Sequence, residues 1–334
     1  MNGVILSAMR NIAVAALMLA PLAAGAAEPP LVWRHAIIEA KSDAGIFFMI
    51  TRGFAEKQGL SLEMSQVKTD AIGLKALIAG ELDSYDGTIG GTVMAAARGA
   101  EVKLIGCHWP GLPHGIFTKA GVTSVAELRG KTFAISTPSS LPDLLAKAAL
   151  AKFGIAANEV KFANLGADLD RYKALAVGVV DATVVSGEYA PIATTQGLKL
   201  LLPGREVLPN YMRLCYFSTA RALQARHEAA VRFMAAEMAA LRYALSHREE
   251  TIALTREITG AKADDPRPAY IFDDTVKTHA VDPELSLPME KIQWMADQLV
   301  TEGGLTRSFD MAKMIDPSIR EAALARLAQT AGSR

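Results

Sequence analysis

One segment of the chain is echoed later, and this echo constrains the fold more than any other feature. KALIAGELDS at residues 75–84 returns 98 residues later as KALAVGVVDA at residues 173–182. Both copies have the pattern of a helix end, a glycine able to adopt the left-handed conformation that stops a helix, and a short step into a strand. Such joints are common, so the pattern alone fits either a chance match or two α/β units of the same design.

A glycine beside an acid follows each of these two strands. The first copy leads into Asp86-Gly87 and the second into Gly187-Glu188. Loops at the carboxyl ends of strands are where open α/β sheets bind ligands. Two units built alike therefore predict two lobes that present similar loops to one cleft.

The N-terminus has the pattern of a secretory leader. Residues 1–27 carry one charge, Arg10, followed by an apolar run and a small-residue stretch that predicts cleavage after Ala26 or Ala27. Met9 would serve equally well as the start. The apolar run is shorter than the roughly 20 residues that a membrane span needs, and Pro21 interrupts it. No cysteine follows the cleavage point, so we expect a free exported protein rather than a lipoprotein.

The charge balance excludes two classes of partner. Lysine and arginine together number 35, as do aspartate and glutamate, and loss of the leader with Arg10 leaves a small acidic excess. This balance provides no electrostatic footprint for nucleic acid or for an anionic membrane. The chain of 334 residues exceeds one usual core and suits two lobes.

Strands and helices are predicted to alternate along the chain. A β-α-β-α-β order over residues 32–107 and a second such cycle over residues 123–204 favour sheets with parallel strands and helices on both faces. Residues 221–258 are predicted to be almost wholly helical. Residues 261–287 are richer in proline and aspartate and are predicted to form a loop, with further helices at 289–301, 310–314 and 318–329.

Three motifs, in this order and spacing, resemble those of a known family. They are GFAEKQGL at residues 53–60, SVAELRGKT at residues 124–132, and Leu175-x-x-Gly178-x-x-Asp181-Ala182. They are similar to signatures of the substrate-binding proteins of ABC importers for nitrate, sulfonate, taurine and thiamine-pyrimidine precursors. Together the motifs cover most of residues 32–218.

The resemblance implies a two-lobed type II periplasmic binding protein, each lobe a mixed, mostly parallel sheet flanked by helices. After the signal peptide at 1–27, the first lobe would comprise residues 28–118 and 211–334, and the second 119–210. Two crossings, near Thr118-Lys119 and Asn210-Tyr211, would form the hinge. The resemblance further implies a monomer in the periplasm that delivers a small-molecule ligand to a membrane permease powered by a separate ATPase.

Loops of both lobes are candidates for the ligand site. They follow predicted strands or lie beside the predicted hinge. The candidate residues are Lys41, Ser42, Asp43, Tyr85, Asp86, Thr88, Trp109 and His114 from the first lobe, and Ser136, Thr137, Ser139, Ser140, Ser186, Glu188 and Tyr189 from the second.

Several of these residues have a second interpretation. The hydroxyl-rich loop at 136–140 could bind an anion with the free N–H groups of a helix start, or could be an ordinary N-cap. Trp109 could stack on a ligand or pack between the lobes. We expect His114 to be a hydrogen-bonding loop residue rather than a catalytic base.

The charge of the ligand is open. Asp86 and Glu188 would suit a cationic ligand or one with N–H donors, but either carboxylate could instead accept backbone N–H groups at a helix start. Lys41 could balance both acids. Because the hydroxyl-rich loop at 136–140 could instead bind an anion, the sign of the ligand's charge remains undetermined.

Enzyme chemistry finds little support in the sequence. The six histidines show no metal-binding spacing, and neither a nucleophile elbow nor a P-loop is present. We expect no metal, cofactor or catalytic residue. The alternative is an enzyme on the same fold, such as a decarboxylase or a pyrimidine synthase. The yeast thiamine-pyrimidine synthases of this kind carry a cysteine cluster, which this chain lacks. A receptor that feeds a sensor kinase is a third option.

The two cysteines, Cys107 and Cys215, fall on predicted strands of the first lobe. The resemblance implies that these strands are antiparallel neighbours, and an oxidising compartment permits a bridge. Strand centres rarely meet the geometric requirement of a disulfide, so we expect two reduced, buried thiols.

Overall fold

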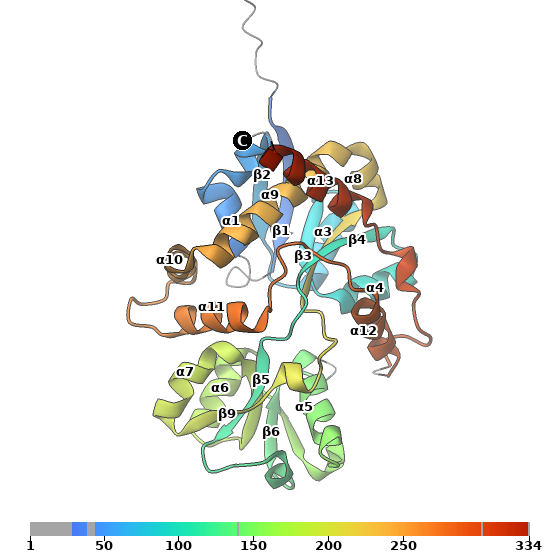
Figure 1. Ribbon diagram of the computed structural model, residues 1–334. Coiled ribbons are helices and arrows are strands. Elements are labelled where there is room, and N and C mark those ends of the chain that lie inside the picture. The colour runs from blue at the N-terminus through green and yellow to red at the C-terminus, as the bar shows by residue number, and fades with distance from the viewer. Residues whose placement is uncertain (1–28, 39–43, 139, 302, 333–334) are drawn as a thin grey trace, which may run out of the picture.

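The computed structural model describes residues 29–38, 44–138, 140–301 and 303–332. The proposed leader and the candidate residues Lys41, Ser42, Asp43 and Ser139 lie outside this part of the chain. The described residues form two lobes, each built on a five-stranded mixed sheet flanked by helices, one above the other in Figure 1. The predicted two-lobed α/β fold is confirmed.

The sheet of the first lobe has the order β2-β1-β3-β10-β4. Its strands β1 and β2 pair in parallel, as do β1 and β3, whereas β10 is antiparallel to both of its neighbours. The returning strand β10 thus enters between two strands from the beginning of the chain. The strands are β1 (Leu31–Ile37), β2 (Leu60–Gln66), β3 (Ser84–Gly87), β4 (Val102–Trp109) and β10 (Leu214–Thr219).

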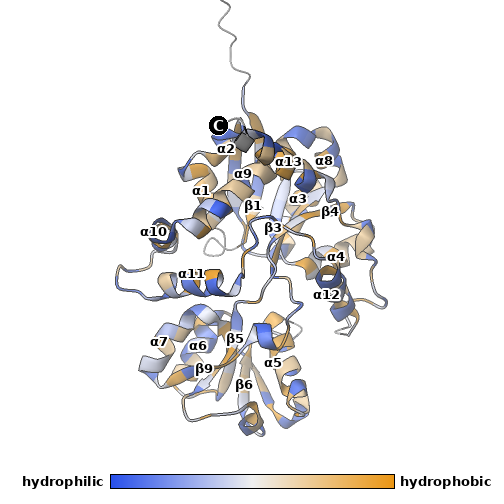
Figure 2. Cartoon of the chain, viewed as in Figure 1, coloured by the Kyte–Doolittle hydropathy of each residue, from blue (hydrophilic) through white to orange (hydrophobic). Residues whose placement is uncertain are grey.

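Helices cover both faces of this sheet, and the buried apolar residues come from both helices and strands. Figure 2 colours each residue of the chain by its hydropathy. None of the helices in the described ranges is long and apolar enough to cross a membrane. The helices are α1 (Ala44–Thr51), α2 (Phe54–Lys57), α3 (Asp70–Ala79), α4 (Ile89–Ala97), α8 (Ala220–Ala225), α9 (His227–Ser246), α10 (Arg248–Thr259), α11 (Arg267–Thr278), α12 (Met289–Thr301) and α13 (Ser318–Gly332).

The sheet of the second lobe has the order β7-β6-β8-β5-β9. Here β5 is the antiparallel strand, between β8 and β9. The strands are β5 (His114–Lys119), β6 (Thr132–Ile135), β7 (Lys161–Asn164), β8 (Ala182–Ser186) and β9 (Leu198–Pro203), with helices α5 (Leu141–Lys152), α6 (Asp168–Ala176) and α7 (Ala190–Ala193) and the short 3-10 turns η4 (Gly187–Tyr189) and η6 (Gly204–Glu206).

The chain changes lobes at two places. The first lies between the end of β4 at Trp109 and the start of β5 at His114, and the second lies within residues 207–213. Thr118 and Lys119 pair with Lys199 and Leu198, so these two residues lie inside the second sheet rather than at a crossing. The strand β5, which precedes the motif at residues 124–132, already belongs to the second lobe. The first crossing therefore lies before β5 rather than near Thr118 and Lys119, as was predicted.

The echo seen in the sequence is part of a longer structural repeat with the same offset of 98 residues. Gly80 and Gly178 end their helices with the same left-handed φ of 80°. The backbone N–H of Arg34 donates to Asp83 Oδ2 over 2.8 Å, and that of Thr132 donates to Asp181 Oδ2 over 2.9 Å. The two lobes therefore share local hydrogen bonds as well as a motif.

Helix α11 corrects one prediction, because it occupies part of the segment 261–287 that was expected to be a loop. Its two prolines stand at the very start, with Pro266 at the N-cap and Pro268 in the first turn. A helix tolerates proline there because the first N–H groups have no partner within the helix. The prolines that suggested a loop are therefore compatible with a helix start.

A disulfide joins Cys107 to Cys215, so the prediction of two free thiols is wrong. The expected antiparallel neighbourhood of their strands is correct, since Cys215 of β10 pairs directly with Cys107 of β4. Their Cα atoms are 3.9 Å apart, next to a register shift between Leu214 and Cys215. Two residues that lie directly opposite each other beside a strand irregularity are closer together than residues paired in the centre of regular strands.

The disulfide predicts the outcome of two measurements. Titration of the denatured, unreduced protein should reveal no free thiol, whereas two titratable groups would contradict the bridge. The double variant C107A/C215A should lose about 2 to 5 kcal/mol of unfolding free energy in a denaturant titration, because a long loop is no longer closed in the unfolded chain.

Candidate functional site

A cleft of about 430 Å³ lies between the two lobes. This volume falls in the range of sites for small molecules. The second lobe contributes His114, Asp168, Ser186 and Glu188 to its lining, and the crossing segment contributes Pro113. The first lobe contributes Trp109, Arg213, Thr255, Thr259, Gly260, Ala261, Asp265, Arg267, Pro268 and Ile271.

On the second lobe, Asp168 organises the wall of the cleft. It begins α6, and its Oδ2 accepts a hydrogen bond of 2.8 Å from the backbone N–H of Ser186, where β8 ends. The buried Arg171 donates to the other carboxylate oxygen. Nε2 of His114 lies 3.8 Å from Asp168 Oδ2. A single carboxylate at the start of α6 thereby contacts the end of β8 and lies close to the start of β5.

On the first lobe, Trp109 and Arg213 form the part of the cleft next to the two crossings. Trp109 ends β4, and Arg213 precedes β10 directly. The backbone N–H of Arg213 donates to the carbonyl of Trp109 over 3.0 Å. Both side chains are largely buried, with exposed fractions of 5% and 7%. The pairing of β4 with β10 thus brings both residues to the lining of the cleft.

Arg267, at the start of α11, brings a second guanidinium to the cleft. It donates to the carboxylate of Asp265 from Nε over 3.0 Å and from Nη2 over 2.6 Å. These hydrogen bonds raise the pKa of Arg267 against the effect of burial, and the charge of Glu188 raises it further. Cζ of Arg267 lies 5.9 Å from the ring centroid of Tyr189. A first-lobe arginine therefore interacts with two second-lobe side chains.

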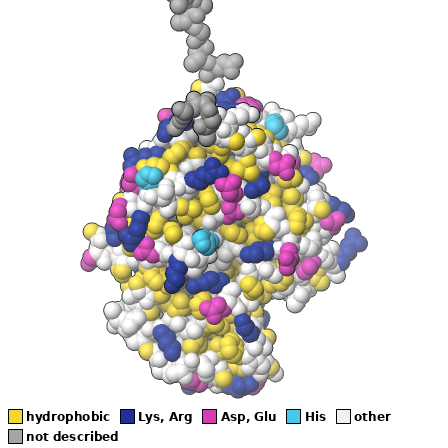
Figure 3. All heavy atoms as spheres, in the orientation of Figure 1, with side chains coloured by type: hydrophobic (Ala, Val, Ile, Leu, Met, Phe, Trp, Pro, Cys, Tyr) yellow, Lys and Arg dark blue, Asp and Glu magenta, His cyan; other side chains and the backbone are white. Residues whose placement is uncertain are grey.

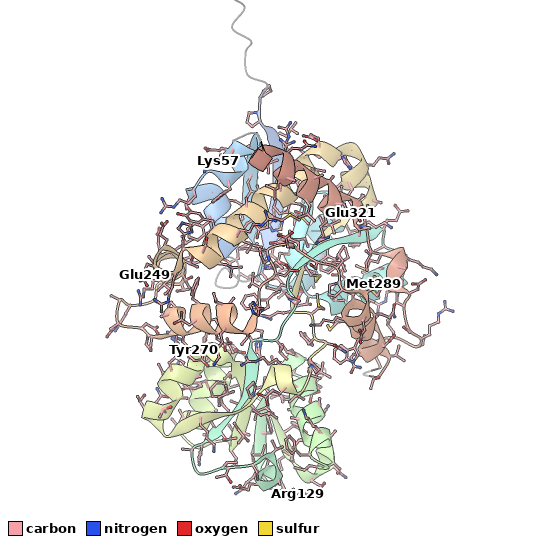
Figure 4. The ribbon with its side chains drawn as sticks, viewed as in Figure 1. Lys57, Arg129, Glu249, Tyr270, Met289 and Glu321 are labelled. Atoms are coloured by element: carbon pink, nitrogen blue, oxygen red, sulfur yellow. A yellow bond between two sulfur atoms is a disulfide. The ribbon has the colours of Figure 1, made fainter. Side chains whose placement is uncertain are left out.

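Helix α11 is held against the second lobe at more than one point. Arg205 Nη1 of η6 lies 3.4 Å from Asp274 Oδ2 of α11. Residues of α11 also contact η4 and α7. Figure 1 shows α11 lying across the second lobe, and Figure 4 labels Tyr270 at this boundary. An element of the first lobe thus forms one wall of the cleft and bridges to the other lobe.

Four of the residues predicted from sequence, Trp109, His114, Ser186 and Glu188, line this cleft together. The first-lobe residues Tyr85, Asp86 and Thr88 lie elsewhere. The hydroxyl of Tyr85 donates to Asp70, which also accepts hydrogen bonds from Thr88.

Asp86 is enclosed in the core of the first lobe. Its Oδ1 lies 3.1 Å from Nε2 of His108, and its exposed fraction is 1%. Burial raises the pKa of Asp86 above its usual range, although His108 opposes this shift. Asp86 therefore interacts with the interior of the first lobe and lies outside the cleft lining.

The remaining candidates on the second lobe also lie outside the cleft lining. Ser136, Thr137 and Ser140 belong to the turn after β6, where Ser140 Oγ donates to the carbonyl of Thr137 over 2.6 Å. Tyr189 is buried, and its ring stacks on that of Tyr172 with a centroid distance of 4.4 Å.

Sequence reasoning missed the largest share of the lining, which comes from Asp168, Arg213 and the end of α10 with α11. Asp168 stands 98 residues after Asp70, so extending the repeat backward would have marked it as the start of the equivalent helix, although not as a residue of the cleft. Arg213 lies two residues before Cys215. Only the disulfide between Cys215 and Cys107 shows that this part of the chain lies beside the end of β4. Nothing in the local sequence indicates that α11, which follows α10, contacts the second lobe.

Within the described ranges, no group of three or more histidine, cysteine, aspartate or glutamate side chains is placed to hold a metal ion. On the face of the molecule shown in Figure 3, acidic and basic side chains are interspersed rather than gathered by sign.

A family model described as NMT1/THI5 like matches residues 41–251, more than half of the chain. No curated protein matches the sequence. The fold is similar to that of the periplasmic aliphatic sulphonate binding protein SsuA from Escherichia coli, with a TM-score of 0.72 and 21% identity over 86% of this chain and 93% of that one.

Two further solved structures are also similar. The alkanesulfonate-binding protein SsuA from Xanthomonas axonopodis pv. citri, bound to MOPS, has a TM-score of 0.66 and 19% identity over 87% of this chain and 100% of that one. The periplasmic nitrate-binding protein NrtA from Synechocystis PCC 6803 has a TM-score of 0.66 and 15% identity over 89% of each chain. At these identities the likeness shows a shared fold.

The ion pair between Arg205 and Asp274 predicts a charge-reversal experiment. The variant D274R should shift the molecule toward a more open form, because two arginines would face each other across the lobes. The pair is partly exposed, so we expect a change of about two- to fivefold in the ratio of closed to open forms. Small-angle scattering should report a larger radius of gyration. The double reversal R205D/D274R should restore the wild-type value, and a D274R variant with an unchanged radius would contradict the contact.

Proposed function

Because the chain belongs to the NMT1/THI5-like family, we propose that it is an exported solute receptor that binds a small ligand between its lobes and delivers it to an ABC import permease powered by a separate ATPase. The observation that carries this proposal is the cleft, which has one wall from each lobe. Its location beside the two crossings supports it further. A ligand that contacts both walls favours the closed arrangement over the open one, and hinge motion then couples binding to shape.

We place the ligand site at Trp109, His114, Ser186 and Glu188, together with Arg213, Asp168, Arg267 and their neighbours in the lining. Two of the three acids there, Asp168 and Asp265, already accept hydrogen bonds from arginines of the chain. Arg213 adds a positive charge to the lining. The arrangement supports a small polar ligand that carries hydrogen-bond acceptors or negative charge.

The periplasm is the proposed location, because the N-terminal sequence has the pattern of a cleavable leader. In that compartment a disulfide between Cys107 and Cys215 is chemically stable. We further propose that the receptor acts as a monomer with a permease. Genes for a permease and an ATPase beside this one would support that partner, and a sensor-kinase gene in their place would support the third option named above.

The receptor is favoured over an enzyme on the same fold. Both cysteines of the chain are joined to each other, so neither offers a thiol for catalysis. The solved structures of similar fold described above are named as binding proteins.

A thermal-shift screen tests the receptor proposal directly. Sulfonates, carboxylates, nitrate and pyrimidines should be offered to the purified mature protein. At a hundredfold excess over its dissociation constant, a true ligand should stabilise the protein by about 2.7 kcal/mol and raise its melting temperature. Chromatography of the recovered ligand should show it unchanged, and turnover of the ligand would contradict the receptor proposal.

The charges of the cleft predict opposite effects for two variants. R213Q should weaken binding of the best anion from the screen by about 10- to 100-fold, the worth of a charge-assisted hydrogen bond. E188Q should leave that affinity equal or higher, because it removes a negative charge from the cleft. Calorimetric titration measures both. The surface variant R129Q, whose arginine pairs with Glu159 within the second lobe and outside the cleft lining, is the matched control. Equal losses in R213Q and R129Q would remove Arg213 from the site.

A further inference from the structure

A second, apolar chamber of about 70 Å³, lined by residues of the first lobe, adjoins the polar cleft. Trp109, Thr255, Pro268 and Ile271 line both spaces, so the two spaces adjoin. The chamber is also lined by Ala44, Leu241, Ala244, Leu245, Thr251, Phe272, Thr275 and Val281.

The walls of the chamber offer little to water. The lining from α9 is entirely aliphatic, and α11 contributes Ile271 and Phe272. Two of the threonine hydroxyls are already used as donors, since Thr251 Oγ1 donates to the carbonyl of Ala244 over 2.7 Å and Thr255 Oγ1 donates to that of Thr251 over 2.8 Å. A lining of this kind favours an apolar group over water.

Trp109 stands where the cleft and the chamber meet. Its indole N–H is buried, and it has no hydrogen-bond partner among the residues that the structure describes. A buried N–H donor without an acceptor is costly, so such groups in native proteins are nearly always satisfied. An acceptor atom of a ligand at this junction would satisfy it.

We propose that the ligand of this receptor is amphiphilic, with a compact acceptor-bearing or anionic head in the cleft beside Trp109 and Arg213 and a short apolar group in the chamber. This inference rests on the proposed receptor function and narrows its ligand class. In this arrangement the apolar group enters the chamber beside the residues that line both spaces, which are Trp109, Thr255, Pro268 and Ile271. The chamber then selects for the size of that group.

Two homologous series of ligands test the inference by calorimetric titration. One series is acetate, butyrate and hexanoate, and the other is methanesulfonate, butanesulfonate and hexanesulfonate. In the series whose head fits the cleft, affinity should rise about fourfold for each methylene that enters the chamber and level off once the chamber is full. The ratio of the butyl to the methyl affinity is the readout.

Three variants separate the chamber from the head site. A244L fills the chamber, so the butyl-to-methyl ratio should fall toward one. I271A enlarges it, so the longest chain that still gains affinity should become longer, and this variant serves if A244L does not fold. W109F removes the indole N–H, so it should weaken binding of every ligand of the series, including the methyl compounds that do not reach the chamber. Ala253 is exposed on the same helix as Thr255, and A253L is the matched control with an unchanged ratio.

Each contrary result has a distinct meaning. If the short ligands bind and chain length has no effect, or if A244L and I271A both leave the ratio unchanged, the amphiphilic ligand is wrong and the receptor proposal stands. If neither series binds while another solute from the thermal-shift screen does, the proposed ligand class is again wrong. If no solute of any class binds, the receptor proposal falls and takes this inference with it.

Discussion

The pairing of β4 with β10 is the constraint on which the cleft depends. These two strands are joined by the disulfide between Cys107 and Cys215, and each continues directly into one of the two connections between the lobes. The same pairing sets Trp109 beside Arg213 through a backbone hydrogen bond. A slip of one residue would turn either side chain to the other face of the sheet. A covalent link at this point therefore protects both the spacing of the connections and the first-lobe wall of the cleft.

The repeat of 98 residues shows how one local design gives different results in the two lobes. Asp70 and Asp168 begin equivalent helices, and each accepts a backbone N–H from the end of the neighbouring strand, at Thr88 and Ser186. In the first lobe, Tyr85 also donates to this carboxylate. The equivalent position in the second lobe holds Thr183, whose hydroxyl donates to the backbone carbonyl of Ala134. Asp168 instead contacts Arg171 and His114 and lines the cleft.

The comparison of lobes also explains what the sequence could and could not predict. Local patterns were sufficient for the alternation of strands and helices, for the two lobes, and for placing Ser186 and Glu188 at the end of a strand that faces the cleft. The matching loop of the first lobe looks the same locally, yet Tyr216 of β10 pairs with Asp86 there and His108 of β4 hydrogen bonds to it. A strand inserted from more than a hundred residues away decides that environment. Helix α11 was missed because proline is read as a helix breaker, although it is tolerated in a first turn.

Helix α11 has three roles. It lines the cleft, it lines the apolar chamber, and it contacts the second lobe. Its ion pair with Arg205 is partly exposed, so that pair alone contributes little to holding the lobes together. Weak direct contact is what a receptor of the proposed kind requires. Lobes that closed firmly without ligand would leave nothing for the ligand to shift, since a ligand changes an equilibrium only by its difference in affinity for the two states. In our proposal, a ligand in the cleft contacts Arg267 of the first lobe and Ser186 of the second. These contacts supply the free energy that favours the closed arrangement. Helix α11 couples binding to closure because it contacts both the ligand site and the second lobe.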